Sequence, residues 1–205
     1  PPNFFMKFIE EDKKDLIRDE SFIKPRKIII EMKKEFSARN DLQRSIIDFL
    51  SGEGSYSEIV DKPRRALFVD TGEGKTFLTI NDISKVGLAT VILCPDNRAV
   101  KTWREEITKF TNVEDKEIIT ICGSDTLENL AYSKNLGKIY LLSLKTITSM
   151  VDNGRDNIIV DFFVNNGIGY KVSDETHMML KAFFNVEMLI QTKKTTYLTA
   201  TDSRR

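Results

Sequence analysis

A glycine-containing turn between two apolar runs is the part of the sequence best suited to chemistry. Residues 66–69 are apolar throughout, "DTGEGKT" follows at residues 70–76, and a new apolar pattern begins at once. Glycine permits positive φ, and the N–H groups at a helix start attract anions. Lys75 offers a cation for terminal phosphates, and Thr76 offers a hydroxyl for Mg²⁺. The candidate phosphate-binding residues are Thr71, Gly72, Glu73, Gly74, Lys75 and Thr76.

This turn departs from the strict phosphate-binding pattern at one place. The pattern G-x-x-x-x-G-K-[ST] requires glycine where Val69 stands. An ordinary strand–turn–helix corner is therefore a competing interpretation, and other parts of the chain must decide between the two.

A pair of carboxylates follows about a hundred residues later. Asp174 and Glu175 come after the candidate strand 168–173, which Lys171 and Ser173 interrupt with polar side chains. Strand–loop phosphate sites need a carboxylate on a neighbouring strand to hold Mg²⁺ and orient water. Asp174 would then reach the Mg²⁺ hydration shell, and Glu175 would polarise the attacking water. An acidic pair at a helix start is also simply good capping, so that interpretation stays open.

The elements that must position these residues alternate between strand and helix from residue 65 onward. We expect strands at 66–69, 90–94, 117–122, 138–142, 168–173 and 195–199, and helices at 75–86, 98–110, 144–151, 157–165 and 177–191. This alternation predicts an α/β fold with a mainly parallel sheet flanked by helices. Ligands bind beyond the carboxyl ends of such strands, and the glycine turn lies at one of them.

The N-terminal region has a different character, and we expect residues 1–37 to form an extension to a domain at 38–205. Residues 4–22 alternate in charge and predict an exposed helix, while the apolar run in residues 25–34 predicts a short strand. A further helix is expected to start near Asn40 or Asp41.

Composition limits the kind of protein. The chain of 205 residues has 40% hydrophobic and 30% charged residues and a formal net charge of zero, so any nucleic-acid contact must come from local patches. Cys94 and Cys122 lie in apolar runs and resemble small core residues. No stretch predicts a transmembrane helix or signal peptide, which indicates no membrane contact and an intracellular location, cytoplasmic, nuclear or in a host cell if viral.

These segments together resemble the first RecA-like lobe of superfamily 2 helicases and translocases. The sequence looks closest to the DExH and chromatin-remodeller branches and to viral or phage members. The resemblance runs in order through "NDLQ" (40–43), "DTGEGKT" (70–76), residues 91–110, "IYLLSLKTI" (139–147), "DETH" (174–177) and "LTAT" (198–201). The resemblance implies a RecA-like P-loop NTPase lobe with the N-terminal extension added.

The resemblance also implies a function: an ATP-dependent helicase or translocase lobe that uses ATP and Mg²⁺ on DNA or RNA, with DNA slightly favoured. In such enzymes a second RecA-like lobe completes the site, so this chain by itself is expected to hydrolyse ATP poorly. The implied roles are adenine reading for Gln43, catalysis for Lys75, Asp174, Glu175 and His177, Mg²⁺ binding for Thr76 and Asp174, nucleic-acid contact for Arg98, Lys101 and Lys145, and coupling for His177, Thr199 and Thr201.

Other interpretations remain. Arg98, Lys101 and Arg104 form a basic helix face that could simply be solvated, and the spacing of Trp103 with neighbouring apolar residues favours core packing over base stacking. A kinase or GTPase-like switch fits less well, because no guanine-reading Asn-Lys-x-Asp segment is present. A helicase-like lobe that has lost catalysis and serves as a binding or scaffolding module is the alternative function.

Overall fold

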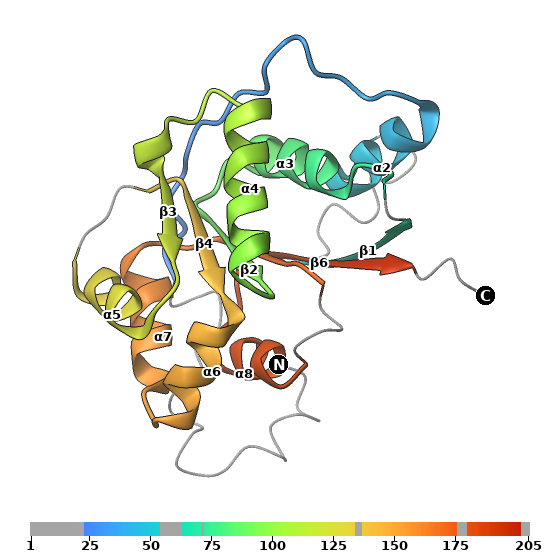
Figure 1. Ribbon diagram of the computed structural model, residues 1–205. Coiled ribbons are helices and arrows are strands. Elements are labelled where there is room, and N and C mark those ends of the chain that lie inside the picture. The colour runs from blue at the N-terminus through green and yellow to red at the C-terminus, as the bar shows by residue number, and fades with distance from the viewer. Residues whose placement is uncertain (1–22, 54–62, 71, 134–136, 176–179, 202–205) are drawn as a thin grey trace.

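The computed structural model describes residues 23–53, 63–70, 72–133, 137–175 and 180–201, and Figure 1 shows their arrangement. The strands are β1 (Arg64–Asp70), β2 (Thr90–Cys94), β3 (Ile118–Ile121), β4 (Ile139–Ser143), β5 (Tyr170–Ser173) and β6 (Lys194–Thr201). The helices are α2 (Asp41–Ser51), α3 (Lys75–Val86), α4 (Asn97–Phe110), α5 (Ser124–Tyr132), α6 (Leu144–Asp152), α7 (Asp156–Asn165) and α8 (Leu180–Leu189), with a 3₁₀ turn η3 (Asp115–Glu117).

The six strands form one sheet in the order β1-β6-β5-β2-β4-β3, and every pair is parallel. The predicted α/β fold with a parallel sheet is therefore confirmed. Asp70 is in register with Thr201, and Cys94 with Ser143, so the carboxyl ends of these strands share one edge. The turns that follow β1 and β5 lie along that edge.

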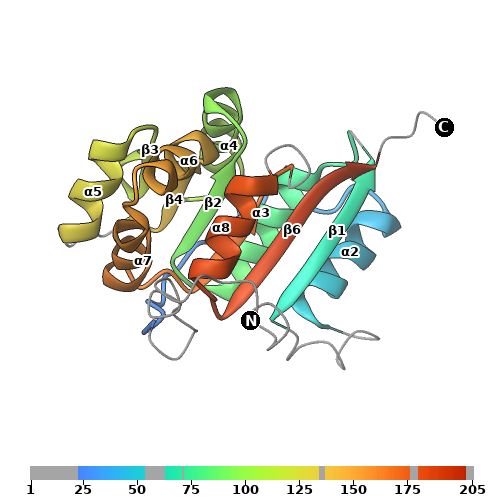
Figure 2. The ribbon, with the colours of Figure 1, turned by 90° about the horizontal axis from the view of Figure 1, so that it is seen from below.

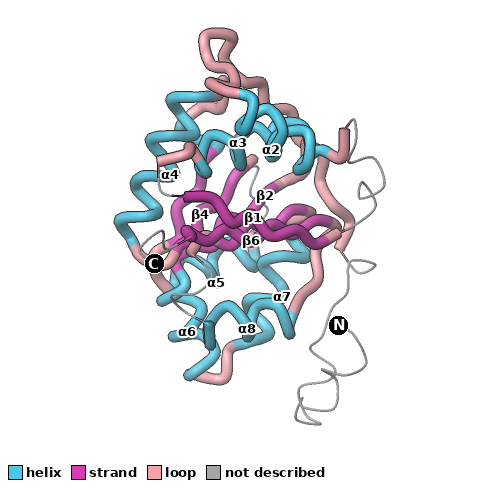
Figure 3. The backbone as a smooth tube through the Cα atoms, turned by 90° about the vertical axis from the view of Figure 1, so that its right-hand side faces the viewer, coloured by secondary structure: helices cyan, strands magenta, loops and turns pink. Residues whose placement is uncertain are grey.

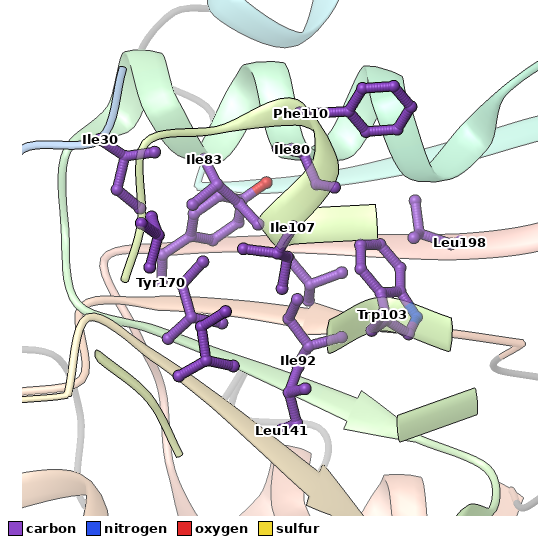
Figure 4. Packing of buried hydrophobic residues seen from close by; sticks show 14 of the residues in the cluster. Ile30, Ile80, Ile83, Ile92, Trp103, Ile107, Phe110, Leu141, Tyr170 and Leu198 are labelled. Carbon is purple, nitrogen blue, oxygen red and sulfur yellow. The ribbon is translucent and has the colours of Figure 1, made fainter. Parts of the chain in front are cut away.

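Helices cover the sheet from both sides. Figure 3 shows α2, α3 and α4 over one face and α5, α6, α7 and α8 over the other. Successive residues of β2 alternate between the two cores: Ile92 packs on the α3 side, and Val91 and Leu93 pack on the α7 side. This burial on both faces explains why the strand is apolar at every position. Figure 4 shows the α3-side core, with Trp103 and Ile107 pointing toward Ile92.

β1 differs from the central strands, because it is an edge strand whose residues alternate between buried and exposed. Leu67 and Val69 are buried, but Phe68 is 65% exposed. An unbroken apolar run such as residues 66–69 predicts a strand buried on both faces, and that interpretation is wrong here. Figure 2 shows the reason: among the described elements α8 lies over the middle of the sheet, and no helix covers β1, which lies beyond β6, on that face.

Three other expectations also need correction. Residues 25–34 form no strand; among the described residues they make only the isolated bridges Lys27↔Leu88 and Met32↔Thr111. The helix α5 was not predicted. Cys94 is buried as expected, but Cys122 is exposed. The helix predicted at residues 4–22 lies outside the described residues.

The segment from Ile23 to Met32 runs along the amino-terminal edge of the sheet. Ile23 belongs to the core on the α7 side, whereas Ile28 and Ile30 belong to the core on the α3 side. The N–H of Arg26 donates to the carbonyl of Gly167 at 2.9 Å, and its guanidinium donates to the carbonyl of Gly137. This segment therefore contacts both hydrophobic layers, while a domain boundary between residues 37 and 38 stays a prediction.

A buried polar network joins α3 to β5 and β6 near the same edge. The Lys194 ammonium lies 2.6 and 2.8 Å from the two carboxylate oxygens of Asp82, and the Tyr170 hydroxyl donates to Asp82 Oδ2 at 2.5 Å. Lys194 also donates to the carbonyl of Leu50 at 3.0 Å, and the Tyr170 hydroxyl lies 2.8 Å from that of Thr196. Asp82 is 2% exposed, so its charge depends on these partners.

Candidate nucleotide-binding site

The turn between β1 and α3 is shaped by two glycines in the left-handed region. Gly72 has φ 94°, and Gly74, the N-cap residue of α3, has φ 83°. A Cβ at Gly74 would lie 2.9 Å from Nε2 of Gln43, so this position excludes larger residues by conformation and by space. No described side chain caps α3. An N-terminus of this kind directs N–H groups and the positive end of the helix dipole at an anion.

Lys75 and Glu175 meet across the carboxyl edge of the sheet. Lys75 is the first residue of α3, and its Nζ lies 2.9 Å from Oε1 of Glu175, which follows β5. The two side chains are 14% and 25% exposed, so the pair is partly shielded but open to solvent on one side. The structure therefore brings together the glycine turn and the carboxylate pair that are a hundred residues apart in the sequence.

The backbone at Glu175 is unusual, because its φ is 45°. It is the one non-glycine residue with positive φ among the described residues. Left-handed backbone costs a non-glycine residue about 1 kcal/mol or more. This conformation lies in the turn after β5 that places the Glu175 carboxylate beside Lys75.

The neighbouring carboxylate, that of Asp174, is bound by a side chain of α4. Trp103 on α4 donates its indole N–H to Asp174 Oδ2 at 2.8 Å, and the Asp174 N–H donates to the carbonyl of Leu93 at 3.0 Å. Burial raises the pKa of Asp174, and the hydrogen bond from Trp103 opposes that rise. Trp103 is 3% exposed, so the expected core packing is observed, but its contact with Asp174 was not predicted. The sequence offers only a general indication of this contact, because a buried indole needs an acceptor for its N–H but the pattern does not say which one.

A pocket of about 370 Å³ opens beside the turn. Gly74 and Thr76 line it on the α3 side, Phe36 and Arg39 line it from the segment before α2, and Lys109 lines it from α4. Its walls combine aromatic rings, two cations, the Glu106 carboxylate, the Gln43 amide and the hydroxyls of Ser37 and Thr76. Position and size suit a flat organic group attached to a phosphate chain at the turn.

Gln43 lies against the turn itself. Its Nε2 donates to the carbonyl of Glu73 at 2.8 Å, and its Oε1 accepts from the N–H of Arg39 at 2.9 Å. Arg39 Nη2 donates to the carbonyl of Gly72 at 3.3 Å. Gln43 is 1% exposed. The side chains of Arg39 and Gln43, at the start of α2, thus bind main-chain carbonyl groups of the phosphate-binding turn.

A divalent ion at this edge would need oxygen ligands beyond the protein. Among the residues that the structure describes, no three His, Cys, Asp or Glu side chains cluster to hold a metal. Thr76 and Asp174 offer a hydroxyl and a carboxylate, which are the ligand types that Mg²⁺ prefers, and Mg²⁺ usually shares such groups with substrate phosphates and waters. The residues present therefore fit a Mg²⁺ that arrives with a phosphate ligand.

The other predicted site residues are more scattered. Arg98 and Lys101 begin α4, with side chains 96% and 79% exposed, and the exposed Lys145 begins α6. All three follow carboxyl ends of strands, but no described contact joins them to Lys75 or Glu175. Arg104 does not share the exposed basic face, because it pairs with Asp115 at 2.8 Å.

The remaining predicted residues belong to β6 or fall outside the description. Thr199 and Thr201 lie in β6, next to β1, in register with Phe68 and Asp70. Thr71 and His177 lie outside the described residues, so their predicted roles are not addressed by the structure.

The fold is that of a RecA-like helicase domain, and the family match identifies it as the first lobe of a superfamily 2 helicase. The family model described as "Type III restriction enzyme, res subunit" matches residues 23–204. The chain belongs to that family. Comparison with curated proteins gives no significant match.

Solved structures show the same fold. The Hef helicase domain of Pyrococcus furiosus superposes with a TM-score of 0.54 at 19% identity, covering 83% of this chain and 35% of that one. The UvsW helicase of bacteriophage T4 gives 0.56 at 14% identity, covering 85% and 56%. A nuclease-deletion mutant of the Type ISP restriction-modification enzyme LlaGI, in complex with a DNA substrate mimic, gives 0.51 at 14% identity, covering 80% and 18%. The chain spans less than two thirds of each.

One further finding concerns membranes. None of the helices in the described ranges combines the length and apolar character needed to cross a bilayer.

Proposed function

We propose that the chain is the ATP-binding lobe of a nucleic-acid helicase or translocase, and that it couples ATP hydrolysis to movement on DNA or RNA. The observation that carries the proposal is the Lys75–Glu175 pair, 2.9 Å apart at the mouth of the uncapped helix α3. A phosphate-binding cation, a carboxylate and an anion-attracting helix start thus converge at one edge. A purely structural corner has no need of this combination.

Each residue has a distinct part in the proposed chemistry. The N–H groups at the start of α3 and the Lys75 ammonium hold the phosphate chain, and Thr76 and Asp174 hold Mg²⁺, Asp174 through a water. The bound Mg²⁺ supplies positive charge against the phosphate oxygens. Glu175 accepts the proton of the attacking water, a role that is worth roughly 10²–10⁴-fold in rate.

The Lys75–Glu175 ion pair links phosphate binding to activation of the catalytic base. While Lys75 contacts Glu175, its positive charge is partly neutralised, and the carboxylate is less available as a base. When Lys75 turns to a phosphate, Glu175 no longer shares this ion pair, and its carboxylate can accept a hydrogen bond from water. Phosphate binding and activation of the base are therefore linked through the same two side chains.

The pocket beside Gly74 and Thr76 would take the base and ribose. Phe36 can stack on a nucleobase, and Arg39 and Lys109 can meet its polar edge or the ribose hydroxyls. The 370 Å³ volume lies in the range typical of sites for small organic ligands.

Nucleic acid would bind over the exposed side chains of Arg98, Lys101 and Lys145. Exposed cations beside strand ends suit phosphate backbone contacts, which give affinity but no sequence preference. DNA is favoured over RNA, since LlaGI, a protein of similar fold, was solved with a DNA substrate mimic. We further propose that Thr199, Thr201 and His177 couple the two events and that a second RecA-like lobe completes both sites.

The test compares two matched pairs of substitutions in the full chain. Lys75→Ala should weaken MgATP binding, because it removes the phosphate counter-charge. Glu175→Gln should bind MgATP at least as tightly as wild type, since Lys75 loses its competing carboxylate. Lys85→Ala and Glu53→Gln, from a 2.9 Å exposed pair at the other end of α3, are the controls and should change nothing. Binding is measured by isothermal titration calorimetry.

A second measurement addresses catalysis. In a complete two-lobe enzyme carrying this chain, Glu175→Gln should abolish nucleic-acid-stimulated ATP hydrolysis. If wild type binds no MgATP, or if Lys75→Ala binds it as well as wild type does, the nucleotide site is refuted. A non-catalytic scaffolding lobe would then be the better interpretation.

A further inference from the structure

We propose that the face of β1 and β6 beside α8 is a docking surface for residues 5–16 of the same chain. The docking surface consists of side chains from three elements: Arg64, Ala66 and Phe68 of β1, Tyr197 and Thr199 of β6, and Phe184 of α8. The proposal goes beyond the proposed function, because it concerns what packs on the lobe and not which ligand the lobe binds. It gives a place to the N-terminal residues, which precede the described chain.

The docking surface lies on the side of the sheet that α8 covers only in part. Leu67 and Val69 belong to the α3-side core, so Phe68 between them faces the other side, where it is 65% exposed. On the neighbouring strand β6, Tyr197 faces the same side, because its hydroxyl donates to Glu187 of α8 at 2.9 Å. Figure 2 shows β1 beyond β6 on this face, with no described helix over it.

A second aromatic ring borders the docking surface. Phe184 is 51% exposed and lies about one helical turn before Glu187, on the same side of α8. Thr199 lies between α8 and β1 on this face of β6, in register with Phe68. The rings of Phe184 and Phe68 therefore flank Thr199. Apolar area of this kind, gathered across three elements, is typical of a surface on which another element packs.

The described chain begins on the same side of the sheet. Ile23 is buried in the core on the α7 side, which is also the side of α8. Two residues later, near Arg26, the chain passes the start of β5, since the Arg26 N–H donates to the carbonyl of Gly167. Only β6 separates β5 from β1, so this entry point is about 10 Å from β1 across the sheet. Residues 17–22 span up to about 20 Å when extended, which is enough to reach it.

The helix predicted at residues 4–22 has one apolar side. Four apolar side chains share a face at spacings of i, i+3, i+4 and i+11: Phe5, Phe8, Ile9 and Leu16. Four charged side chains fall on the opposite face: Lys7, Glu10, Glu11 and Lys14. A helix over residues 5–16 is about 18 Å long, close to the length of about 23 Å of the seven-residue strand β1. The segment therefore matches the docking surface in length and in apolar character.

One charge on the apolar face has a counterpart on the docking surface. Asp12 lies in line with the apolar residues of the segment. Because Ile23 follows at the amino-terminal edge of the sheet, the carboxyl half of the helix must lie over the amino half of β1. Arg64, the first residue of β1, is exposed there. Asp12 would therefore meet Arg64, while the aromatic residues of the segment meet Phe68. A tethered segment also acts at an effective concentration on the order of mM, which favours it over a second copy of the chain.

Disulfide cross-linking in the full chain tests this docking. Ala66→Cys, on the exposed face of β1, is combined with Ile9→Cys, so that every aromatic residue stays in place. The control combines Ala66→Cys with Lys7→Cys, two residues away and on the opposite face of the helix. Both pairs carry Cys122→Ser as well, because Cys122 is exposed, whereas Cys94 is buried.

We expect the Ile9 pair to form a disulfide within one chain, at a rate that does not depend on protein concentration. That rate should exceed the rate of the Lys7 pair by on the order of tenfold, since docking hides Lys7 from β1. Adding Phe68→Ser should lower the rate by on the order of tenfold, because one buried aromatic contact is lost. Adding Tyr132→Ser, at a 63% exposed ring on α5, should leave the rate unchanged. Thermal unfolding confirms that each variant is folded.

Three results would overturn the inference. Equal rates for the Ile9 and Lys7 pairs would show that the segment is tethered but does not dock. A rate that rises with protein concentration would show that a second copy of the chain occupies the docking surface. No disulfide in either pair, with the thiols shown to be reactive by labelling, would show that neither occupant binds there. None of these results bears on the proposed nucleotide site, which is tested separately by MgATP binding.

Discussion

Replacing Asp82 with asparagine isolates the contribution of the buried network at the amino-terminal edge of the sheet. The substitution keeps the shape of the side chain but removes the charge that lies 2.6 and 2.8 Å from the Lys194 ammonium and accepts from Tyr170 at 2.5 Å. The Lys194 side chain is 12% exposed, so water replaces little of the lost interaction. Removing one partner of such a buried pair costs about 3–5 kcal/mol.

This loss should be visible in thermal and urea unfolding. A domain of 150–250 residues loses about 2–4 °C in melting temperature per kcal/mol, so we expect a decrease of about 6–20 °C. Glu53→Gln is the matched control, because its partner Lys85 also lies on α3 at 2.9 Å but on the surface. That variant should melt close to wild type, since exposed ion pairs contribute little.

A double variant sharpens the comparison. Asp82→Leu combined with Lys194→Met removes both charges and should unfold at a higher temperature than either single change, because no buried charge is left alone. MgATP affinity of Asp82→Asn, measured well below its melting temperature, should match wild type, since the network lies at the edge opposite Lys75. A melting temperature for Asp82→Asn equal to that of Glu53→Gln would refute the reasoning.

Two other predictions concern the indole on α4 and the buried phenols. Trp103→Phe removes the indole hydrogen bond to Asp174, and a hydrogen bond to a charged group is worth about 1.5–3 kcal/mol. We expect a lower stability against urea and weaker Mg²⁺-dependent binding of ATP. No change in either measurement would show that the contact is dispensable. Burial raises the pKa of Tyr140, Tyr170 and Tyr197 above 10.0, so the folded state keeps protons that the unfolded chain releases. The unfolding free energy should therefore lose this contribution as pH rises above about 10, and the phenolate absorbance of these three tyrosines should appear together with unfolding. Ionisation of all three in the folded protein would contradict the prediction.

Much of the architecture could be predicted from local signals. The helix predicted at 75–86 is observed as α3 with the same bounds, because Gly74 and Gly87 mark its two ends. The strand predicted at 90–94 is β2, since a run of five apolar or small residues buried on both faces leaves few alternatives. The other predicted strands from β3 to β6 differ by only a few residues at their ends.

Other features depend on contacts between distant segments. Lys171 interrupts the apolar pattern of β5, yet it is fully buried because Glu187 of α8 lies 2.5 Å from its Nζ. Burial lowers the pKa of Lys171, and Glu187 opposes that change. Residues 25–34 have the apolar pattern of a strand, but their strand pairing is limited to two isolated bridges. No local pattern in the sequence specifies either outcome.

The site shows the same division. The residue types of the turn and of the carboxylate pair predicted that Lys75 and Glu175 would share one edge, as observed. The partners that orient the site could not be predicted. Trp103 reaches Asp174 only because α4 packs on β2 and β4 and β5 lies next to β2, and the Gln43 amide bonds to Glu73 only because α2 packs against α3.

The helix α3 reaches both edges of the sheet, and this fixes the number of residues between its two functional ends. Its first residue, Lys75, faces the phosphate site, and Asp82 lies about 10 Å further along the axis at the buried network. Each added residue turns a helix by about 100°, so one insertion between them would rotate one end away from its partners. The intervening residues 77–80 are buried in the core, so they are constrained as well. Insertions and deletions between Lys75 and Asp82 should be excluded from any functional variant of this lobe.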